Sequence, residues 1–195
     1  QLITEKLAIF NGNTPARGTD VTHWRQANIP FYNDSSHRDP RFYDAAINQF
    51  AVNNNSRYMK DDYTYCNVFA GDVARSMGVP FPTKGEWYNK NDPMTIGFPE
   101  LREYFNGDNP SVSAVNDGWR EVSSSNLEAL EAHVNSGKMG IVISQGHVAV
   151  IKPNQDITDL NSIQIAQAGA TNTNSTTVGK GFGSEIHSAK IFIVD

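Results

Sequence analysis

Three side chains of this sequence have the chemical types needed for nucleophilic hydrolysis: Cys66, His147 and Gln167. Cys66 is the only cysteine and begins a predicted helix, where the partial positive charge and the unpaired N–H groups of a helix N-terminus favour a thiolate. His147 follows Gly146 at the start of a predicted strand, and an imidazole can take the proton of a thiol. The alternative for Cys66 is a buried structural cysteine that packs like a small apolar residue.

The imidazole also needs a partner that fixes its tautomer, and the strand after His147 offers candidates. Directly opposite side chains on adjacent antiparallel strands lie about 5 Å apart, within reach of a hydrogen bond. We expect Gln167 to have this role, because Gln164 points to the opposite face of a regular strand. Asn172 and Asn174, just past the strand, are alternatives. A histidine satisfied by backbone groups is the other interpretation of His147.

Helices are predicted in the first half of the chain. Apolar residues at helical spacing predict a helix over 40–52, with Asp39 as its N-cap. A second apolar stripe predicts a helix over 66–77, which Gly78 closes. Cys66 therefore lies on the buried stripe but in the first turn, where a cleft can reach it.

A further helix is expected to start at Ser124, Ser125 or Asn126 and to run to about Val134. After this helix, the spacing of the apolar residues changes to that of strands. The four predicted strands are 140–144, 148–152, 163–168 and 189–194. Helices followed by an antiparallel meander predict an α+β fold, with N-terminal helices packed on a C-terminal antiparallel sheet. Two segments are expected to add to it: an irregular arm over 1–40, and an insertion near the cleft over 83–120 with a short helix near 100–105.

Composition narrows the class of protein. The 195 residues fit a single domain over 1–195, and 38% hydrophobic with 19% charged residues supports a packed core. A net charge of −5 without long Lys or Arg runs argues against nucleic acid as a partner. No apolar stretch is long enough for a membrane span. The start at Gln1 and the abundance of Gly, Asn and Ser lead us to expect an exported protein: secreted, periplasmic or associated with the cell wall.

The other histidines do not form a metal motif. His23, His37, His133 and His187 are scattered, and the sequence holds neither His-Glu-x-x-His nor Cys-x-x-Cys. We therefore expect no metal and no cofactor.

Cys66, His147 and Gln167 together resemble the catalytic residues of the bacterial papain-like cysteine hydrolases, the group that holds the NlpC/P60 and CHAP peptidoglycan hydrolases. Cys66 and its helix match the nucleophile helix, and Gln167 stands where these domains carry a polar third residue. Gly146-His147-Val148-Ala149-Val150 is similar to their Gly-His-x-Ala segment. The resemblance covers roughly residues 58–170. The chain reads Tyr65-Cys66-Asn67-Val68, without the Asp before and the Ser-Gly after the cysteine of the NlpC/P60 pattern, so the subfamily and the bond cleaved stay open.

This resemblance implies a papain-like fold and hydrolysis of an amide bond in peptidoglycan. Cys66 would attack the carbonyl carbon, His147 would act as base and then as acid, and Gln167 would orient His147. The Cys66 N–H, with a donor from residues 63–65, would stabilise the oxyanion. The residues expected to bind substrate are Tyr63, Tyr65, Asn67 and Trp87. Trp87 and Trp119 would cap the cleft or belong to the core.

Other function classes stay open on the sequence alone. The same three residues could serve a transglutaminase, a deamidase or another acyltransferase. An antibacterial effector would need a cognate immunity protein that covers the cleft. A non-catalytic wall-binding module would keep the cleft without a reactive thiol, and fast alkylation of Cys66 near neutral pH is the expected sign of an enzyme.

Overall fold

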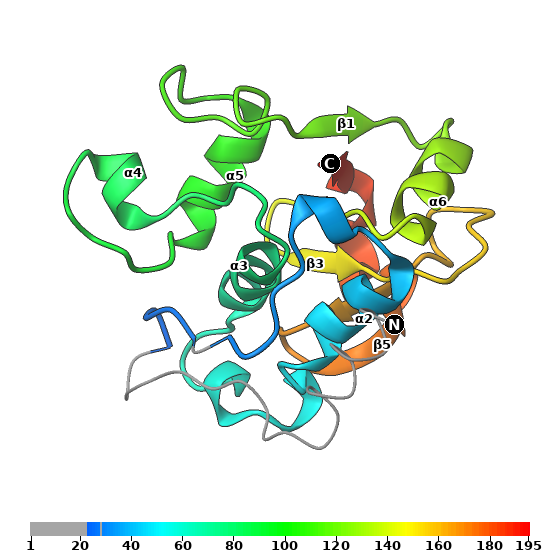
Figure 1. The fold of residues 1–195 in the computed structure, drawn as a ribbon, viewed down its shortest axis with the longest axis horizontal. Helices are drawn as coiled ribbons and strands as arrows, with labels where there is room; N and C mark the ends of the chain where they lie inside the picture. The colour runs from blue at the N-terminus through cyan, green and yellow to red at the C-terminus, as the bar shows by residue number, and fades with distance from the viewer. Residues whose placement is uncertain (1–22, 28) are drawn as a thin grey trace.

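The computed structural model describes residues 23–27 and 29–195, which form an α+β fold around one antiparallel sheet (Figure 1). The strands are β1 (Arg120–Val122), β2 (Gly140–Ile143), β3 (Val148–Ile151), β4 (Gln164–Gln167), β5 (Thr173–Thr177) and β6 (Lys190–Ile193). Their order in the sheet is β1-β6-β2-β3-β4-β5, and every pair is antiparallel. The meander therefore runs from β2 to β5, whereas β6 returns to lie between β2 and β1.

The four strands predicted from the sequence are all present, with ends that differ by one residue. The sequence analysis missed β1 and β5, which are the two edges of the sheet. Much of each edge strand faces solvent, and β5 reads Thr-Asn-Ser-Thr-Thr with no buried position. An edge strand of this kind lacks the apolar alternation by which strands are recognised.

The four predicted helices are present as α2 (Pro40–Asn48), α3 (Cys66–Ser76), α5 (Phe98–Asn106) and α6 (Leu127–Asn135). The chain also forms α4 (Lys84–Tyr88) and α7 (Val178–Phe182). Asp39 caps α2 by accepting a hydrogen bond from the N–H of Arg41, and α2 ends four residues before the predicted end. The sequence analysis missed α4 and α7, each five residues long. Short 3₁₀ segments connect these elements: η1 (Ser35–His37), η2 (Val52–Asn54), η3 (Ser56–Tyr58) and η4 (Gly183–Ser188).

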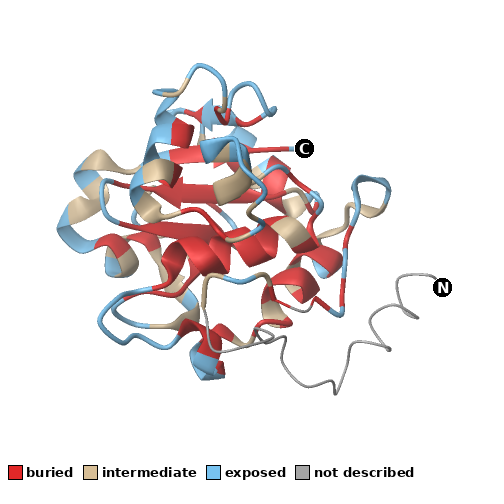
Figure 2. Cartoon of the chain, turned by 90° about the vertical axis from the view of Figure 1, so that its left-hand side faces the viewer, coloured by how far each residue is buried: buried red, intermediate tan, exposed pale blue. Residues whose placement is uncertain are grey.

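The centre of the sheet is buried throughout, because every residue of β2 and β3 is buried (Figure 2). The helix α3 packs against β3 and β4, and α2 packs against α3 (Figure 1). Ten of the eleven residues of α3 are buried, so the helix lies inside the molecule rather than on its surface. This packing places the first residue of α3, Cys66, against the sheet.

A buried ion pair fixes α3 to the segment before it. The guanidinium of Arg57 donates to both carboxylate oxygens of Asp72, with Nε–Oδ2 and Nη2–Oδ1 distances of 2.8 and 3.1 Å. The hydroxyl of Tyr58 donates to the same carboxylate at 2.6 Å. The side chains of Arg57 and Asp72 are 2% and 1% exposed, so solvent does not screen the pair. These contacts hold η3 against the helix that carries Cys66.

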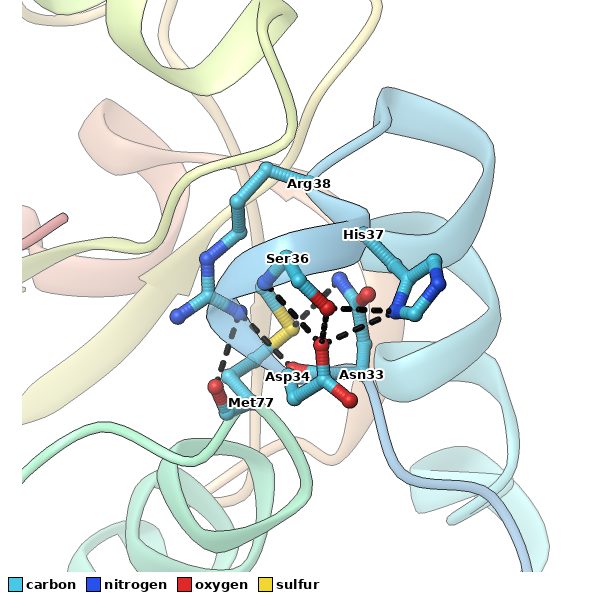
Figure 3. Close-up of polar contacts among 6 residues, drawn as sticks. All are labelled: Asn33, Asp34, Ser36, His37, Arg38 and Met77. Carbon is cyan, nitrogen blue, oxygen red and sulfur yellow. Dashed lines mark hydrogen bonds and ion pairs between the residues drawn. The ribbon is translucent and has the colours of Figure 1, made fainter.

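The C-terminal end of α3 is held by Arg38 (Figure 3). Its Nη1 donates to the carbonyl oxygens of Asn33 and Met77 at 2.8 and 2.7 Å, and Met77 is the C-cap of α3. The Asn33 amide donates to the Met77 sulfur at 3.6 Å. The helix is thus anchored to segments outside it both at Asp72 in its middle and at its C-terminal end.

Asp34, Ser36 and His37 lie close together in η1 and resemble an acid-histidine-hydroxyl set (Figure 3). The same ring nitrogen, Nδ1 of His37, contacts both Asp34 Oδ1 and Ser36 Oγ at 2.9 Å. A catalytic triad instead uses the two ring nitrogens for two different partners. The cluster therefore serves as an N-cap for η1, in which Asp34 also accepts from the Ser36 N–H.

The expected arm and insertion are described in part. Residues 1–22 and 28 of the arm 1–40 lie outside the described residues, and the rest of it carries η1. The insertion 83–120 holds α4 and α5, of which α5 is longer than the predicted short helix. Over the described ranges 23–27 and 29–195, no helix has the length and apolar character required to cross a membrane.

Candidate active site

Cys66 is the first residue of α3, and its side chain is turned toward the sheet. The N-cap residue, Tyr65, makes no side-chain cap, so the N–H groups of the first turn remain available to other acceptors. Backbone hydrogen bonds from Val148, Asn67 and Cys66 itself reach the sulfur. Val148 directly follows His147, so the thiol lies beside the strand that carries the imidazole.

The predicted contact between His147 and Gln167 is present. Nε2 of His147 lies 2.8 Å from Oε1 of Gln167, and both side chains are buried. The Gln167 amide group donates to the carbonyl oxygen of Thr171 at 3.1 Å, which fixes Oε1 toward the ring. Because an amide oxygen only accepts, Nε2 carries the ring proton and Nδ1 keeps the lone pair of a base.

The two alternative partners of His147 are engaged elsewhere. Asn172 accepts from the Gly169 N–H at 2.9 Å and donates to the carbonyl oxygen of Tyr58 at 2.7 Å. Asn174 donates to the Asn48 side chain at 2.6 Å. Both therefore hold β5 and its turn against the helical half, and neither contacts the imidazole.

The His147 ring is enclosed by Phe182 and Gly169. The ring centroids of His147 and Phe182 are 4.8 Å apart, with the planes tilted by 58°. A Cβ atom at Gly169 would lie 3.0 Å from Cε1 of the imidazole, closer than almost all real contacts of a Cβ atom. The absence of a side chain at position 169 thus leaves room for the ring in the orientation that Gln167 fixes.

For the hydrolysis that the sequence resemblance implies, we expect Gly169→Ala to lower kcat by about tenfold, because the added methyl group would displace the imidazole from the orientation that Gln167 fixes. Stability should change little, since the ring can shift by a few tenths of an ångström. Steady-state kinetics and thermal unfolding of the variant would test this. Wild-type kcat in the folded variant would contradict the tight fit.

Burial dominates the electrostatics of Cys66, contrary to the expectation of a thiolate. Cys66 is 3% exposed, and loss of hydration raises the pKa of its thiol to about 11. Hydrogen bonds from the N–H groups of Val148, Asn67 and Cys66 act in the opposite direction but do not compensate, and the charge of Glu185 raises the pKa further. The N–H groups of the helix N-terminus therefore lower the pKa of the thiol, as predicted, but the loss of hydration raises it by more.

Burial also lowers the pKa of His147, although the Gln167 hydrogen bond and the Glu185 charge raise it in part. At pH 7 the resting groups are consequently a thiol and a neutral imidazole. Proton transfer between groups of this kind would proceed by general-base catalysis, in which the proton leaves sulfur as the new bond forms, rather than from a preformed ion pair.

The raised pKa of Cys66 predicts a specific pH dependence of alkylation. Only the thiolate reacts, so the rate with iodoacetamide should rise about tenfold per pH unit from pH 7 to pH 10, with no plateau at low pH. The same chain unfolded in urea should level off above about pH 8.5, the ordinary pKa of cysteine. A folded-state rate that is already maximal at pH 7 would contradict the neutral resting pair.

A cavity of about 440 Å³ lies over the imidazole and the Gln167 amide. Its polar lining also includes Thr64 from the segment before α3, Lys180 from α7 and Glu185 from η4. Cys66 is buried and does not belong to the lining. The sequence analysis missed Thr64, Lys180 and Glu185, because α7 and η4 carry no apolar period that predicts them.

The four residues expected to bind substrate do not line this cavity. Asn67 is buried and donates to the carbonyl oxygen of Ile96 at 2.7 Å. Tyr65 is buried, stacks on His23 with ring centroids 3.9 Å apart, and donates to the Asp61 carboxylate. Tyr63 is exposed, and Trp87 lies in α4, partly buried against the core. Asn67 and Tyr65 thus support the first turn of α3 from inside the molecule.

Two further residues have structural contacts. Trp119 is 1% exposed and donates its ring N–H to the carbonyl oxygen of Pro80, as expected of a core residue. The ring of His133 contacts the carbonyl oxygens of Met139 and Val194. Among the described residues, no group of three or more His, Cys, Asp or Glu side chains is placed to hold a metal ion.

No family model, no curated protein and no solved structure matches this chain. Function is therefore inferred from the geometry of Cys66, His147 and Gln167 and from the sequence resemblance that these residues carry.

Proposed function

We propose that the protein is a cysteine amidohydrolase with a papain-like arrangement of its catalytic residues. The observation that carries this proposal is the hydrogen bond between His147 and Gln167, together with a cysteine in the first turn of a buried helix whose sulfur accepts from the N–H of Val148, the residue after His147. A nucleophile, a base with a fixed tautomer and an orienting acceptor are the parts that covalent amide hydrolysis requires.

The proposed reaction proceeds through a thioester. Sγ of Cys66 attacks the amide carbon while Nδ1 of His147 takes the thiol proton, and the imidazolium then protonates the leaving amine as the C–N bond breaks. Water attacks the thioester with His147 as base, and the C–S bond breaks to release the acid and restore the thiol. The N–H groups of the first turn of α3 are suited to stabilise the oxyanion, because Tyr65 does not cap them.

Peptidoglycan is the substrate that we propose, either at a stem-peptide bond or at the amidase bond. Two features support it: the similarity of residues 146–150 to the Gly-His-x-Ala segment of CHAP domains, and a polar cavity over the imidazole that can receive a peptide. This substrate places the protein outside the cytoplasm, as a secreted, periplasmic or wall-associated enzyme. If it acts as an effector against other bacteria, its partner is an immunity protein that covers the cavity.

The test is digestion of purified peptidoglycan by the wild type and by Cys66→Ala, with mass spectrometry of the released fragments. We expect new stem-peptide termini with the wild type alone, and their masses identify the bond. Cys66→Ser controls for the loss of sulfur at nearly constant volume and should also be inactive.

The outcomes separate this proposal from the other function classes. Products in which an added amine replaces water would identify an acyltransferase that uses the same residues. Binding to the wall that is equal in wild type and Cys66→Ala, without any cleavage, would overturn the hydrolase in favour of a binding module. Slow alkylation of the resting thiol no longer favours a binding module, because burial alone explains it.

A further inference from the structure

Glu185 brings a carboxylate to the cavity beside the proposed catalytic pair. It lies in η4 and lines the cavity together with His147 and Gln167. A Cβ atom at Gly146 would lie 2.6 Å from its Oε1, so the carboxylate lies against the loop before His147, in space that a side chain at position 146 would need. Its charge acts on Cys66 and on His147 alike, which places it near both reactive groups.

This carboxylate has no partner within residues 23–27 and 29–195. The Glu185 side chain forms no hydrogen bond and no ion pair there, and only its backbone oxygen accepts, from Ser188. Lys180 lines the same cavity but is exposed and forms no ion pair with Glu185. The described part of the chain therefore does not supply the cation that would neutralise this charge.

An unpaired carboxylate at this position acts on the proposed chemistry in two opposite ways, because it favours the imidazolium of His147 but disfavours negative charge at Cys66. Attack by Cys66 moves negative charge onto the sulfur and then onto the carbonyl oxygen, and a nearby anion makes both states less favourable. A cation bound in the cavity would remove this repulsion of the negative charge. No group of three or more metal-ligating side chains lies among the described residues, whereas a cationic group of the substrate would enter the cavity together with the amide.

We propose that Glu185 binds a primary ammonium group that the substrate carries close to the scissile amide. This inference rests on the proposed amide hydrolysis and names its substrate class: a peptide with a free amine next to the cleaved bond. Binding of the ammonium group would stabilise the developing negative charge, so substrates that carry it would react faster and neutral analogues would react slowly.

The test measures the charge preference of Cys66 without any amide cleavage. Three methanethiosulfonates that carry a trimethylammonium, a methyl or a sulfonate group are reacted with the protein at pH 8.5, and modification is followed by mass spectrometry. The rate with each reagent is first divided by its rate with a small neutral thiol, which removes the intrinsic reactivity of the reagent. After this correction, wild-type Cys66 should react about tenfold faster with the cationic than with the neutral reagent, which is the scale of one charge pair at a partly hydrated site. Glu185→Gln should abolish that preference.

The matched control is Glu121→Gln, which removes the same charge from an exposed position in β1, at the opposite edge of the sheet from β5. It should keep the wild-type preference. An equal loss in Glu121→Gln and Glu185→Gln, or a preference that Glu185→Gln retains, would overturn the subsite.

A second measurement separates this inference from the proposed function. Soluble wall fragments are offered with their free amines intact or acetylated. Hydrolysis of both forms at equal rates would support the amidohydrolase and overturn the ammonium subsite. A cationic preference that depends on Glu185, without cleavage of any fragment, would support cation binding and overturn the hydrolase. Equal modification by all three reagents, without cleavage of any fragment, would overturn both.

Discussion

Replacement of His147 by alanine is expected to lower kcat on a peptidoglycan fragment by about 10³-fold or more. The resting thiol has a raised pKa, so without Nδ1 of His147 no group takes its proton at neutral pH. The KM should change little, because the imidazole acts in the transition state rather than in substrate binding. Steady-state kinetics near pH 7 would measure both parameters.

The control for His147→Ala is His37→Gln, which alters a histidine whose hydrogen bonds are confined to Asp34 and Ser36. That variant should retain wild-type kcat. Because His147→Ala also leaves the buried Gln167 oxygen without its partner, His147→Gln should be prepared alongside and its folding compared by circular dichroism. Activity within tenfold of wild type in either folded His147 variant would contradict the general-base role.

Asp72→Asn should destabilise the protein by about 3–5 kcal/mol, the usual cost of removing one partner of a buried ion pair. The variant keeps the volume of the side chain but leaves the Arg57 guanidinium buried without its counter-charge. For a chain of this size that loss corresponds to a fall in Tm of roughly 10 °C. Calorimetry and urea unfolding would measure it.

Two variants make this prediction specific. Tyr58→Phe removes a single hydrogen bond to the same carboxylate and should cost only about 1–2 kcal/mol. Asp62→Asn removes an exposed aspartate just before α3 and should stay within about 0.5 kcal/mol of wild type. An effect of Asp72→Asn no larger than that of Asp62→Asn would show that the buried pair does not hold η3 and α3 together.

The parts of the fold that could be predicted from the sequence are those whose residues face a core. The stripe that begins at Cys66 predicted α3, and the apolar runs after position 138 predicted β2, β3, β4 and β6, because burial imposes a helical or strand period on the sequence. The edge strands and the helices α4 and α7 carry no such period. The edge strands depend on hydrogen bonds to strands that the chain meets only once it is folded, whereas α4 and α7 are marked in the sequence only by their capping residues, Thr83 and Thr177.

The candidate site shows the same division. The pairing of His147 with Gln167 followed from the strand period, which decides which side chains share a face. The raised pKa of Cys66 could not be predicted in this way, because the burial of the thiol depends on how the whole sheet covers α3. Glu185 could not be placed either, since its position beside Gly146 depends on the return of η4 to the loop before His147.

The burial of Cys66 also bears on how the thiol withstands oxidation. Oxidants and disulfides attack cysteine as the exposed thiolate, and sulfenic acid formed there proceeds to products that cannot be repaired. A thiol that is 3% exposed and has a pKa of about 11 offers these reagents few opportunities to react. The same depth that would make the proposed nucleophile dependent on His147 would therefore protect it in the oxidising environment that the proposed location implies.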